Sequence, residues 1–182
     1  MMPSQMMPST HLPRGLVLNG TVGAGKTTVA EAIGDLLAER RTPHAVLDLD
    51  WLRRCWPAPG DDPFNTGLCL RNLAAVAANA RQAGASLLVI AGVVETRGER
   101  ARLEQSAGFP LTVCRLLVDA EVARRRLTER HRLDPDSRDW HLNRVAELDR
   151  ILAAAGVDDA VVTVGTNTPR QVASGVLAAV GW

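Results

Sequence analysis

An eight-residue loop near the start of the chain restricts the possible folds more than any other feature. Residues 20–27 read G-T-V-G-A-G-K-T and fit the pattern G-x-x-x-x-G-K-[ST]. The apolar run 16–18 precedes the loop, and a helical pattern with Val29, Ile33 and Leu36 on one face follows it. Glycines let such a backbone curl until successive N–H groups point at one anion, and the helix N-terminus adds its own unpaired N–H groups. This context predicts a phosphate-binding loop between a strand and a helix.

The residue types in this loop suit ATP and its metal ion. Lys26 can reach the β- and γ-phosphates, and the Thr27 hydroxyl can bind Mg²⁺. Lys26 is the only lysine among 21 basic residues, which indicates that this position needs an ammonium group. The residues expected to contact the nucleotide here are Gly20, Val22, Gly23, Ala24, Gly25, Lys26, Thr27 and Thr28.

Short apolar runs alternate with helical patterns along the rest of the chain, as in repeated βαβ units with a parallel sheet. The run 87–91 is apolar at every position, which is typical of a central strand buried on both faces. The sequence therefore predicts an α/β fold of three layers, in one domain over residues 15–182 behind a flexible leader at 1–14. Strands are expected near residues 16–18, 45–49, 87–91, 111–118 and 161–164.

Composition and charge narrow the choice of partners and compartment. The formal net charge is +1, so bulk electrostatics give no reason to expect nucleic acid or an anionic membrane as a partner. No apolar run approaches the length of a membrane span, and the leader lacks the apolar core of a signal peptide. We expect a cytoplasmic protein that acts on a small molecule, and a homodimer stays open. Three widely spaced cysteines, Cys55, Cys69 and Cys114, are expected to be reduced and mostly buried.

The second predicted strand ends in a segment with two aspartates, at the sheet edge where ligands bind in open α/β folds. If strand alternation continues, Asp48 and Asp50 point in the same direction. Asp50 is our candidate for the base that takes the proton from an attacking hydroxyl, and Asp48 for a contact to the acceptor. A carboxylate at this edge can instead hold Mg²⁺ through water, and both aspartates can simply cap the following turn or helix.

Four arginines are candidates for binding the acceptor, because a guanidinium group binds anions in a bidentate manner. Arg53 follows the two aspartates, Arg71 begins the helix after a proline-rich loop, and Arg97 and Arg100 follow the third strand. The alternative for each is a solvated surface charge. The third strand lacks an acidic residue beside its apolar core, and Glu95 is the nearest substitute for a second magnesium ligand.

The segment 124–138 combines dense positive charge with a proline and predicts an arginine-rich lid over the phosphates. Arg126 and Arg130 lie four residues apart and therefore share a helical face. The alternative is a basic, solvated helix surface. In the loop after the last predicted strand, Thr166 is expected to border the adenine ring, or else the loop only caps the final helix.

These motifs resemble those of the small P-loop kinases, which include adenylylsulfate kinase, chloramphenicol phosphotransferase and gluconate kinase. Asp48-x-Asp50-x-x-Arg53 is similar to the D-G-D-N-x-R stretch of adenylylsulfate kinases. Residues 46–52 look like the strand of chloramphenicol phosphotransferase that ends in its proposed catalytic aspartate, which falls on Asp50. The spacing of Arg126 and Arg130 is similar to the lid motifs of the group.

The resemblance implies a P-loop NTPase fold with a five-stranded parallel sheet in the order 2-3-1-4-5, helices on both faces, and the use of Mg-ATP. It also implies that Arg126 lies near the adenine and Arg130 near the phosphates, where Arg130 joins Lys26 and Asp50 as a catalytic residue.

We therefore expect an ATP-dependent phosphotransferase that moves the γ-phosphoryl group to a hydroxyl of a small metabolite or antibiotic. A nucleoside or nucleotide kinase is a variant of this interpretation. The competing class is a regulatory nucleotide-binding module that hydrolyses slowly or not at all. A GTPase switch is disfavoured because its N-K-x-D base-reading motif needs a second lysine, which the chain lacks.

Overall fold

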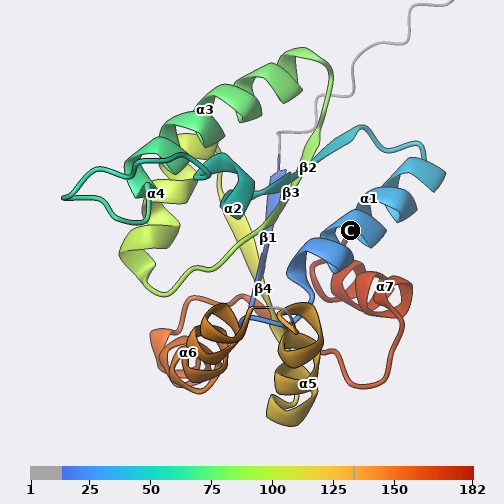
Figure 1. The fold of residues 1–182 in the computed structure, drawn as a ribbon. Coiled ribbons are helices and arrows are strands. Elements are labelled where there is room, and N and C mark those ends of the chain that lie inside the picture. Colours follow the sequence, from blue (N-terminus) through green and yellow to red (C-terminus); the bar gives the residue numbers. More distant parts are fainter. Residues whose placement is uncertain (1–13, 133) are drawn as a thin grey trace, which may run out of the picture.

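The computed structural model describes residues 14–132 and 134–182 (Figure 1). It contains five strands, β1 (Arg14–Asn19), β2 (His44–Asp48), β3 (Leu87–Ala91), β4 (Leu111–Leu117) and β5 (Ala160–Thr163). The helices in these ranges are α1 (Lys26–Glu39), α2 (Leu49–Leu52), α3 (Thr66–Gln82), α4 (Arg97–Ala107), α5 (Ala120–Arg130), α6 (Pro135–Ala155) and α7 (Pro169–Ala179).

The five strands form one parallel sheet in the order β2-β3-β1-β4-β5. This confirms the predicted fold class and strand order. All five residues of β3 are buried, as are all residues of β1 after Arg14. Central strands of a parallel sheet are covered on both faces, so their sequences are continuously apolar rather than alternating.

Helices cover both faces of the sheet and complete three layers (Figure 1). On one face α1 and α7 pack against a core that includes Ile33, Leu37 and Val176. On the other face α3 and α4 pack against a core that includes Leu73, Ile90 and Leu103. The pair α5 and α6 lies beyond the end of β1, on the side where the loop after β1 emerges. None of the helices in the described ranges is both long and apolar enough to span a bilayer.

Two element boundaries differ from the sequence-based expectation. The second strand ends at Asp48, because the Asp48 side chain accepts a hydrogen bond from the Asp50 backbone N–H and caps the short helix α2. The helix expected to begin near residue 139 begins at Pro135. Proline lacks a backbone N–H, which the first turn of a helix does not need, so it starts α6 rather than separating it from a loop.

Arg100 holds α4, β4 and the approach to β5 together, so it is not available to the acceptor as predicted. Its guanidinium group donates hydrogen bonds to the backbone carbonyls of Val157 and Leu111, each at 2.8 Å. It also forms ion pairs with Asp159 at 2.9 Å and with Glu104 at 3.2 Å. These carboxylates raise the pKa of Arg100, most of all through the hydrogen bond to Asp159. The positive charge of Arg100 is therefore paired with groups of the fold itself.

Arg100→Ala should lower the free energy of unfolding by about 1–3 kcal/mol, because two carbonyls and two carboxylates lose their donor. Chemical denaturation at pH 7 measures this change. Arg97→Ala is the matched control, since Arg97 is exposed on the same helix and surface substitutions change stability by about 0.5 kcal/mol or less. Equal losses in the two variants would contradict the structural role of Arg100.

Candidate active site

The loop between β1 and α1 has the backbone conformation that binding of phosphate requires. Gly20, Gly23 and Gly25 have positive φ angles of 143°, 81° and 88°, which residues with a Cβ rarely adopt. A Cβ on Gly20 would lie 2.8 Å from the Leu116 carbonyl oxygen, so the loop passes too close to β4 for any side chain there. Gly25 is the N-cap of α1 and offers no side-chain cap to its first turn. The N–H groups of that turn can therefore bind an anion.

Lys26 and Thr27 begin α1 and face in different directions. The Lys26 ammonium donates hydrogen bonds to the backbone oxygens of Gly20 and Thr21, both at 2.9 Å, and so bridges the loop. The Thr27 hydroxyl donates to the Asp48 carboxylate at 2.7 Å. This hydrogen bond joins the start of α1 to the end of β2 and brings two hard oxygen donors together beside the phosphate loop. Oxygens of this kind are the ligands that Mg²⁺ prefers.

A buried asparagine, which sequence reasoning missed, fixes the phosphate loop to its neighbours. Asn19 is fully buried at the end of β1. Its side-chain oxygen accepts hydrogen bonds from the N–H groups of Gly20 at 2.9 Å and Val94 at 3.1 Å. Its amide nitrogen donates to the Val94 carbonyl at 3.0 Å and to Asp158 at 3.2 Å. Burial raises the pKa of Asp158, and this carboxylate also pairs with Arg115 on β4 at 3.0 Å.

Asp48 lies beside the phosphate loop and Asp50 lines the cavity next to it, but the two do not share one face of a strand as predicted. Asp48 caps α2 and bonds Thr27, whereas Asp50 lies in the first turn of α2. The Asp50 side chain is 84% exposed, and its carboxylate lies 3.8 Å from Nε of Arg53. Both Asp50 and Arg53 line a large cavity next to the phosphate loop.

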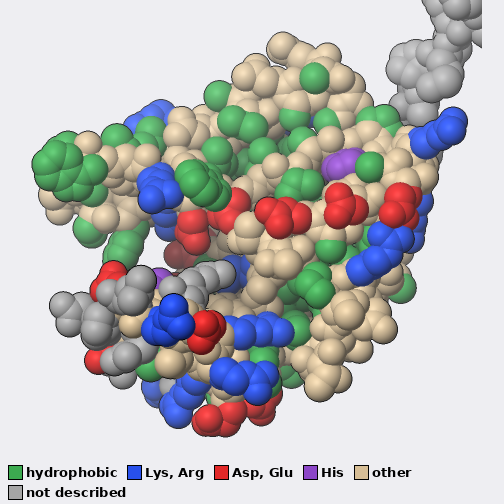
Figure 2. Space-filling model, turned by 45° about the vertical axis from the view of Figure 1, so that its right-hand side comes forward, with side chains coloured by type: hydrophobic (Ala, Val, Ile, Leu, Met, Phe, Trp, Pro, Cys, Tyr) green, Lys and Arg blue, Asp and Glu red, His purple; other side chains and the backbone are tan. Residues whose placement is uncertain are grey.

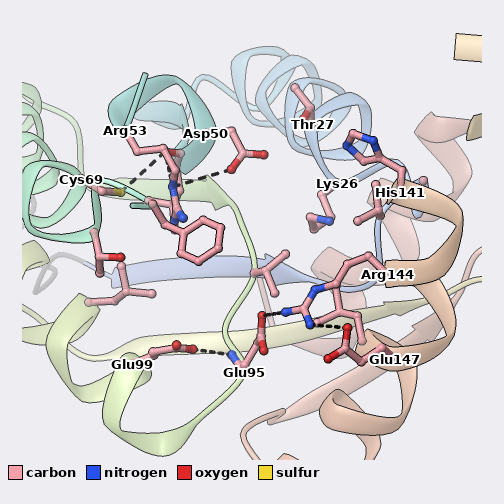
Figure 3. Close-up of a pocket in the computed structure, with 18 of the residues that line it drawn as sticks. Lys26, Thr27, Asp50, Arg53, Cys69, Glu95, Glu99, His141, Arg144 and Glu147 are labelled. Carbon is pink, nitrogen blue, oxygen red and sulfur yellow. Dashed lines mark hydrogen bonds and ion pairs between the residues drawn. The ribbon is translucent and has the colours of Figure 1, made fainter. Parts of the chain in front are cut away.

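This cavity is the larger of two that adjoin the phosphate loop. It has a volume of about 730 Å³ and opens beside Lys26 and Thr27 (Figures 2 and 3). Its walls come from the phosphate loop, α2, the start of α3, the segment from Val93 into α4, and α6. Arg144 on α6 forms ion pairs with Glu95 and with Glu147, the latter at 2.8 Å. Figure 3 shows Arg144 below Lys26, between these two carboxylates.

Several residues of this wall were missed by sequence reasoning. On α6, the residues His141, Arg144 and Glu147 repeat at a spacing of three and line the same cavity. That spacing was a detectable signal for one helical face. Thr66 and Cys69 begin α3 and carried no such signal. Burial raises the pKa of the Cys69 thiol, which keeps it protonated and a poor nucleophile at neutral pH.

A smaller cavity of about 300 Å³ lies on the other side of the phosphate loop. Gly23, Gly25 and Thr28 line both cavities. Arg126 lies in the wall of the smaller cavity and donates a hydrogen bond to the Gly23 carbonyl oxygen at 3.3 Å. Asn167 lines it as well. Thr166, predicted to border the adenine, is not in this wall. It precedes Asn167 in an exposed turn.

The remaining predicted arginines do not gather at the larger cavity. Arg71 is exposed on α3 beside Gly67, and Arg97 is exposed beside Gly156. Neither lines the larger cavity, and Arg100 instead donates hydrogen bonds to backbone groups within the fold. Arg102, one turn after Arg97 and Gly98, does line it. The Arg130 side chain lies outside the described part of the structure, so its predicted role near the phosphates stays a prediction.

The cysteines agree with the sequence-based expectation in two of three cases. Cys69 and Cys114 are buried free thiols, whereas Cys55 is exposed. Burial raises the pKa of Cys114 to about 11.

Solved structures with the same fold cover nearly the whole chain. The tunicamycin resistance protein of Deinococcus radiodurans has a TM-score of 0.64 and 19% identity, over 93% of this chain and 96% of that chain. A gluconokinase from Sinorhizobium meliloti 1021 has a TM-score of 0.60 and 21% identity, over 94% and 93%. Shikimate kinase from Acinetobacter baumannii, solved with shikimate, has a TM-score of 0.59 and 22% identity, over 93% of both chains. At these identities the likeness establishes the fold.

The sequence itself matches a known family. A search of curated proteins finds no match. The profile of a family described as "AAA domain" matches residues 16–155, which include the phosphate loop, Asp48, Asp50 and all of α6. Together with the strand order, this match confirms the resemblance to P-loop kinases. The chain belongs to the AAA-domain family and has a P-loop kinase fold.

Proposed function

We propose that this protein transfers the γ-phosphoryl group of Mg-ATP to a hydroxyl group of a small molecule. One observation carries the proposal: the phosphate loop separates two cavities and lines both of them. The smaller one, beside Arg126 and Asn167, suits the adenosine end of the nucleotide. The larger one provides about 730 Å³ on the γ-phosphate side. A protein that only hydrolyses or senses a nucleotide needs room there for a water molecule, not for a second substrate.

The residues beside the loop fit a magnesium ion. Thr27 Oγ1 and Asp48 Oδ2 are hard oxygen donors that meet at the start of α1. Together with phosphate oxygens and water, these two side chains would hold Mg²⁺, which rarely uses an all-protein cage. When bound, the ion would supply charge neutralisation at the β- and γ-phosphates. We therefore assign Asp48 to the metal rather than to the acceptor.

The chain's own residues supply the rest of the reaction. The N–H groups of the loop and the Lys26 ammonium hold the phosphates and stabilise their developing charge. Asp50 accepts the proton of the acceptor hydroxyl while the oxygen of that hydroxyl forms a bond to the γ-phosphorus. The bond from that phosphorus to the bridging β,γ-oxygen breaks, and ADP leaves with the electron pair. The segment 124–138, where α5 leads into α6, forms the lid, on which Arg126 binds the adenosine side and Arg130 the phosphates.

The decisive experiment is a screen for ADP release over nucleosides, sugars, aminoglycosides and phenicol or peptide antibiotics, with mass detection of a phosphorylated product. An 80 Da mass increase on one compound, dependent on Mg-ATP, establishes the activity. ADP release that is the same with and without every compound would favour the slowly hydrolysing regulatory module instead.

Lys26→Ala should abolish turnover, because no other lysine in the chain can replace its ammonium group. ADP release should fall at least about 100-fold, the scale seen when a single electrostatic donor is removed from a transition state. Thermal melting should show that the fold survives, since the lost hydrogen bonds lie within the loop. Unchanged calorimetric ATP binding together with unchanged turnover would remove this loop from the mechanism.

Replacing Asp50 or Asp48 by asparagine should change different kinetic properties of the enzyme. Asp50→Asn should lower kcat by about 10²–10⁴-fold with little change in the KM for ATP, because only the base is lost. Asp48→Asn should raise the Mg²⁺ concentration needed for half-maximal rate, because a metal ligand loses its charge. Rates measured across a magnesium titration separate the two roles. An Asp50→Asn variant with full kcat and a lower melting temperature would make Asp50 only a helix residue.

A further inference from the structure

The charged side chains that line the larger cavity beyond the phosphate loop carry more negative than positive groups. The arginines are Arg53 directly after α2, Arg102 on α4 and Arg144 on α6. Four carboxylates line the same space: Asp50, Glu95, Glu99 and Glu147. Figure 2 shows acidic and basic side chains side by side around the hollow. Carboxylates therefore outnumber guanidinium groups by one, four against three, in the part of the cavity beyond the phosphate loop.

One arginine of this wall is held by two carboxylates. Arg144 pairs with Glu95 and Glu147, and its side chain is only 25% exposed. On the opposite wall, Nε of Arg53 lies 3.8 Å from Asp50 and donates a hydrogen bond to the Leu49 carbonyl oxygen. An anionic acceptor that bound Arg144 would have to displace one carboxylate and leave it close by. Like charges at such short range strongly disfavour the bound state.

Apolar side chains also line this cavity. Phe64 lines the cavity while 66% exposed, and Leu70, Val93, Leu103 and Leu148 line it too. An exposed aromatic ring in a cavity wall offers a surface for an apolar ligand.

The backbone beside Phe64 is firmly fixed. The amide of buried Asn65 donates hydrogen bonds to the carbonyl oxygens of Arg53 at 3.0 Å and Cys55 at 2.9 Å. Asp62 accepts from the N–H groups of Thr66 and Gly67, both at 2.8 Å, and these bonds lower its pKa. Phe64 is thus part of a preformed wall rather than a loose loop.

We propose that the phosphate acceptor is an uncharged or cationic alcohol with an apolar ring or chain, and that Phe64 and the Arg144 ion pairs select it. The same ion pairs disfavour hydroxy acids, sugar phosphates and nucleotides as acceptors. The inference rests on the proposed phosphotransferase activity, because it describes the second substrate of that reaction.

The test uses hydroxyl compounds in matched sets, in which one alicyclic or aromatic skeleton carries a carboxylate, its methyl ester or a primary amine. Shikimate and methyl shikimate are one such pair. ADP release gives kcat/KM for each member, and calorimetric titration of the ADP-loaded protein gives affinity without turnover. We expect ester or amine members to exceed their carboxylate partners at least tenfold in both measurements.

Two variants connect this selectivity to the structure. Replacing both partners of Arg144, as Glu95→Gln with Glu147→Gln, should free its charge and bring the ester-to-carboxylate ratio close to one or below. Glu31→Gln with Asp35→Asn removes the same two charges from exposed positions on α1 and should leave the ratio unchanged. Phe64→Ala should weaken ester binding about tenfold at constant ATP affinity. Trp56→Ala, at a residue 91% exposed in the same loop and outside the cavity wall, should not.

The outcomes separate the two proposals. Binding of ester or amine members without phosphorylation would contradict the phosphotransferase activity and leave the binding preference intact. Carboxylate members that bind or react as well as their esters would overturn the acceptor class alone. A panel in which no ester or amine binds at millimolar concentration would overturn it too, since the apolar wall would then recognise nothing of that kind.

Discussion

The amide of Asn19 connects the parts of the chain that the site depends on. It lies fully buried where the central strand ends, and its four hydrogen bonds reach the first residue of the phosphate loop, the segment after β3 and the approach to β5. A buried polar group that loses its partners costs about 1–3 kcal/mol. The loop is therefore not a free turn between two elements. It is held in position against Val94, one residue before Glu95 at the wall of the larger cavity.

This connection explains how an almost wholly apolar sheet can support a highly charged site. The central strands β1 and β3 are buried up to their carboxyl ends. Polar groups lie at or beyond the ends of three neighbouring strands: Asn19 after the apolar run of β1, Asp48 at the end of β2, and Glu95 beyond β3. Hydrogen bonds then join these ends sideways, Thr27 to Asp48 and Asn19 to Val94. Parallel topology places the ends at one edge, and the cross-links fix their relative positions. The geometry of the site is thus a property of several strands together, not of one motif.

Most of the fold could be predicted from the sequence, because the patterns that predict it involve residues close together in the chain. Continuous apolar runs located all five strands, and glycine spacing located the phosphate loop. The errors arise where a choice depends on distant residues. Arg100 looked like an anion clamp, but its partners Leu111 and Val157 are brought to it only by the folded sheet.

The prediction for the two aspartates was also wrong, although the residues involved are close together in the chain. The alternation expected for Asp48 and Asp50 fails because Asp48 caps a four-residue helix, too short to leave a periodic pattern. Arg144 had a helical spacing with His141 and Glu147 but no sequence sign of the cavity that it faces.

The distribution of charge around the phosphate loop favours one binding orientation of the nucleotide. At the loop itself the backbone N–H groups and the Lys26 ammonium attract the phosphates. On one side, Arg126 adds positive charge beside the smaller cavity. On the other side, an excess of carboxylates faces the larger cavity, and the Arg144 charge is already paired. An ATP molecule whose phosphates lay at the far wall of the larger cavity, away from Lys26 and the N–H groups of the loop, would meet an excess of carboxylates. The proposed rejection of anionic acceptors and the placement of the triphosphate at the loop would therefore follow from the same ion pairs.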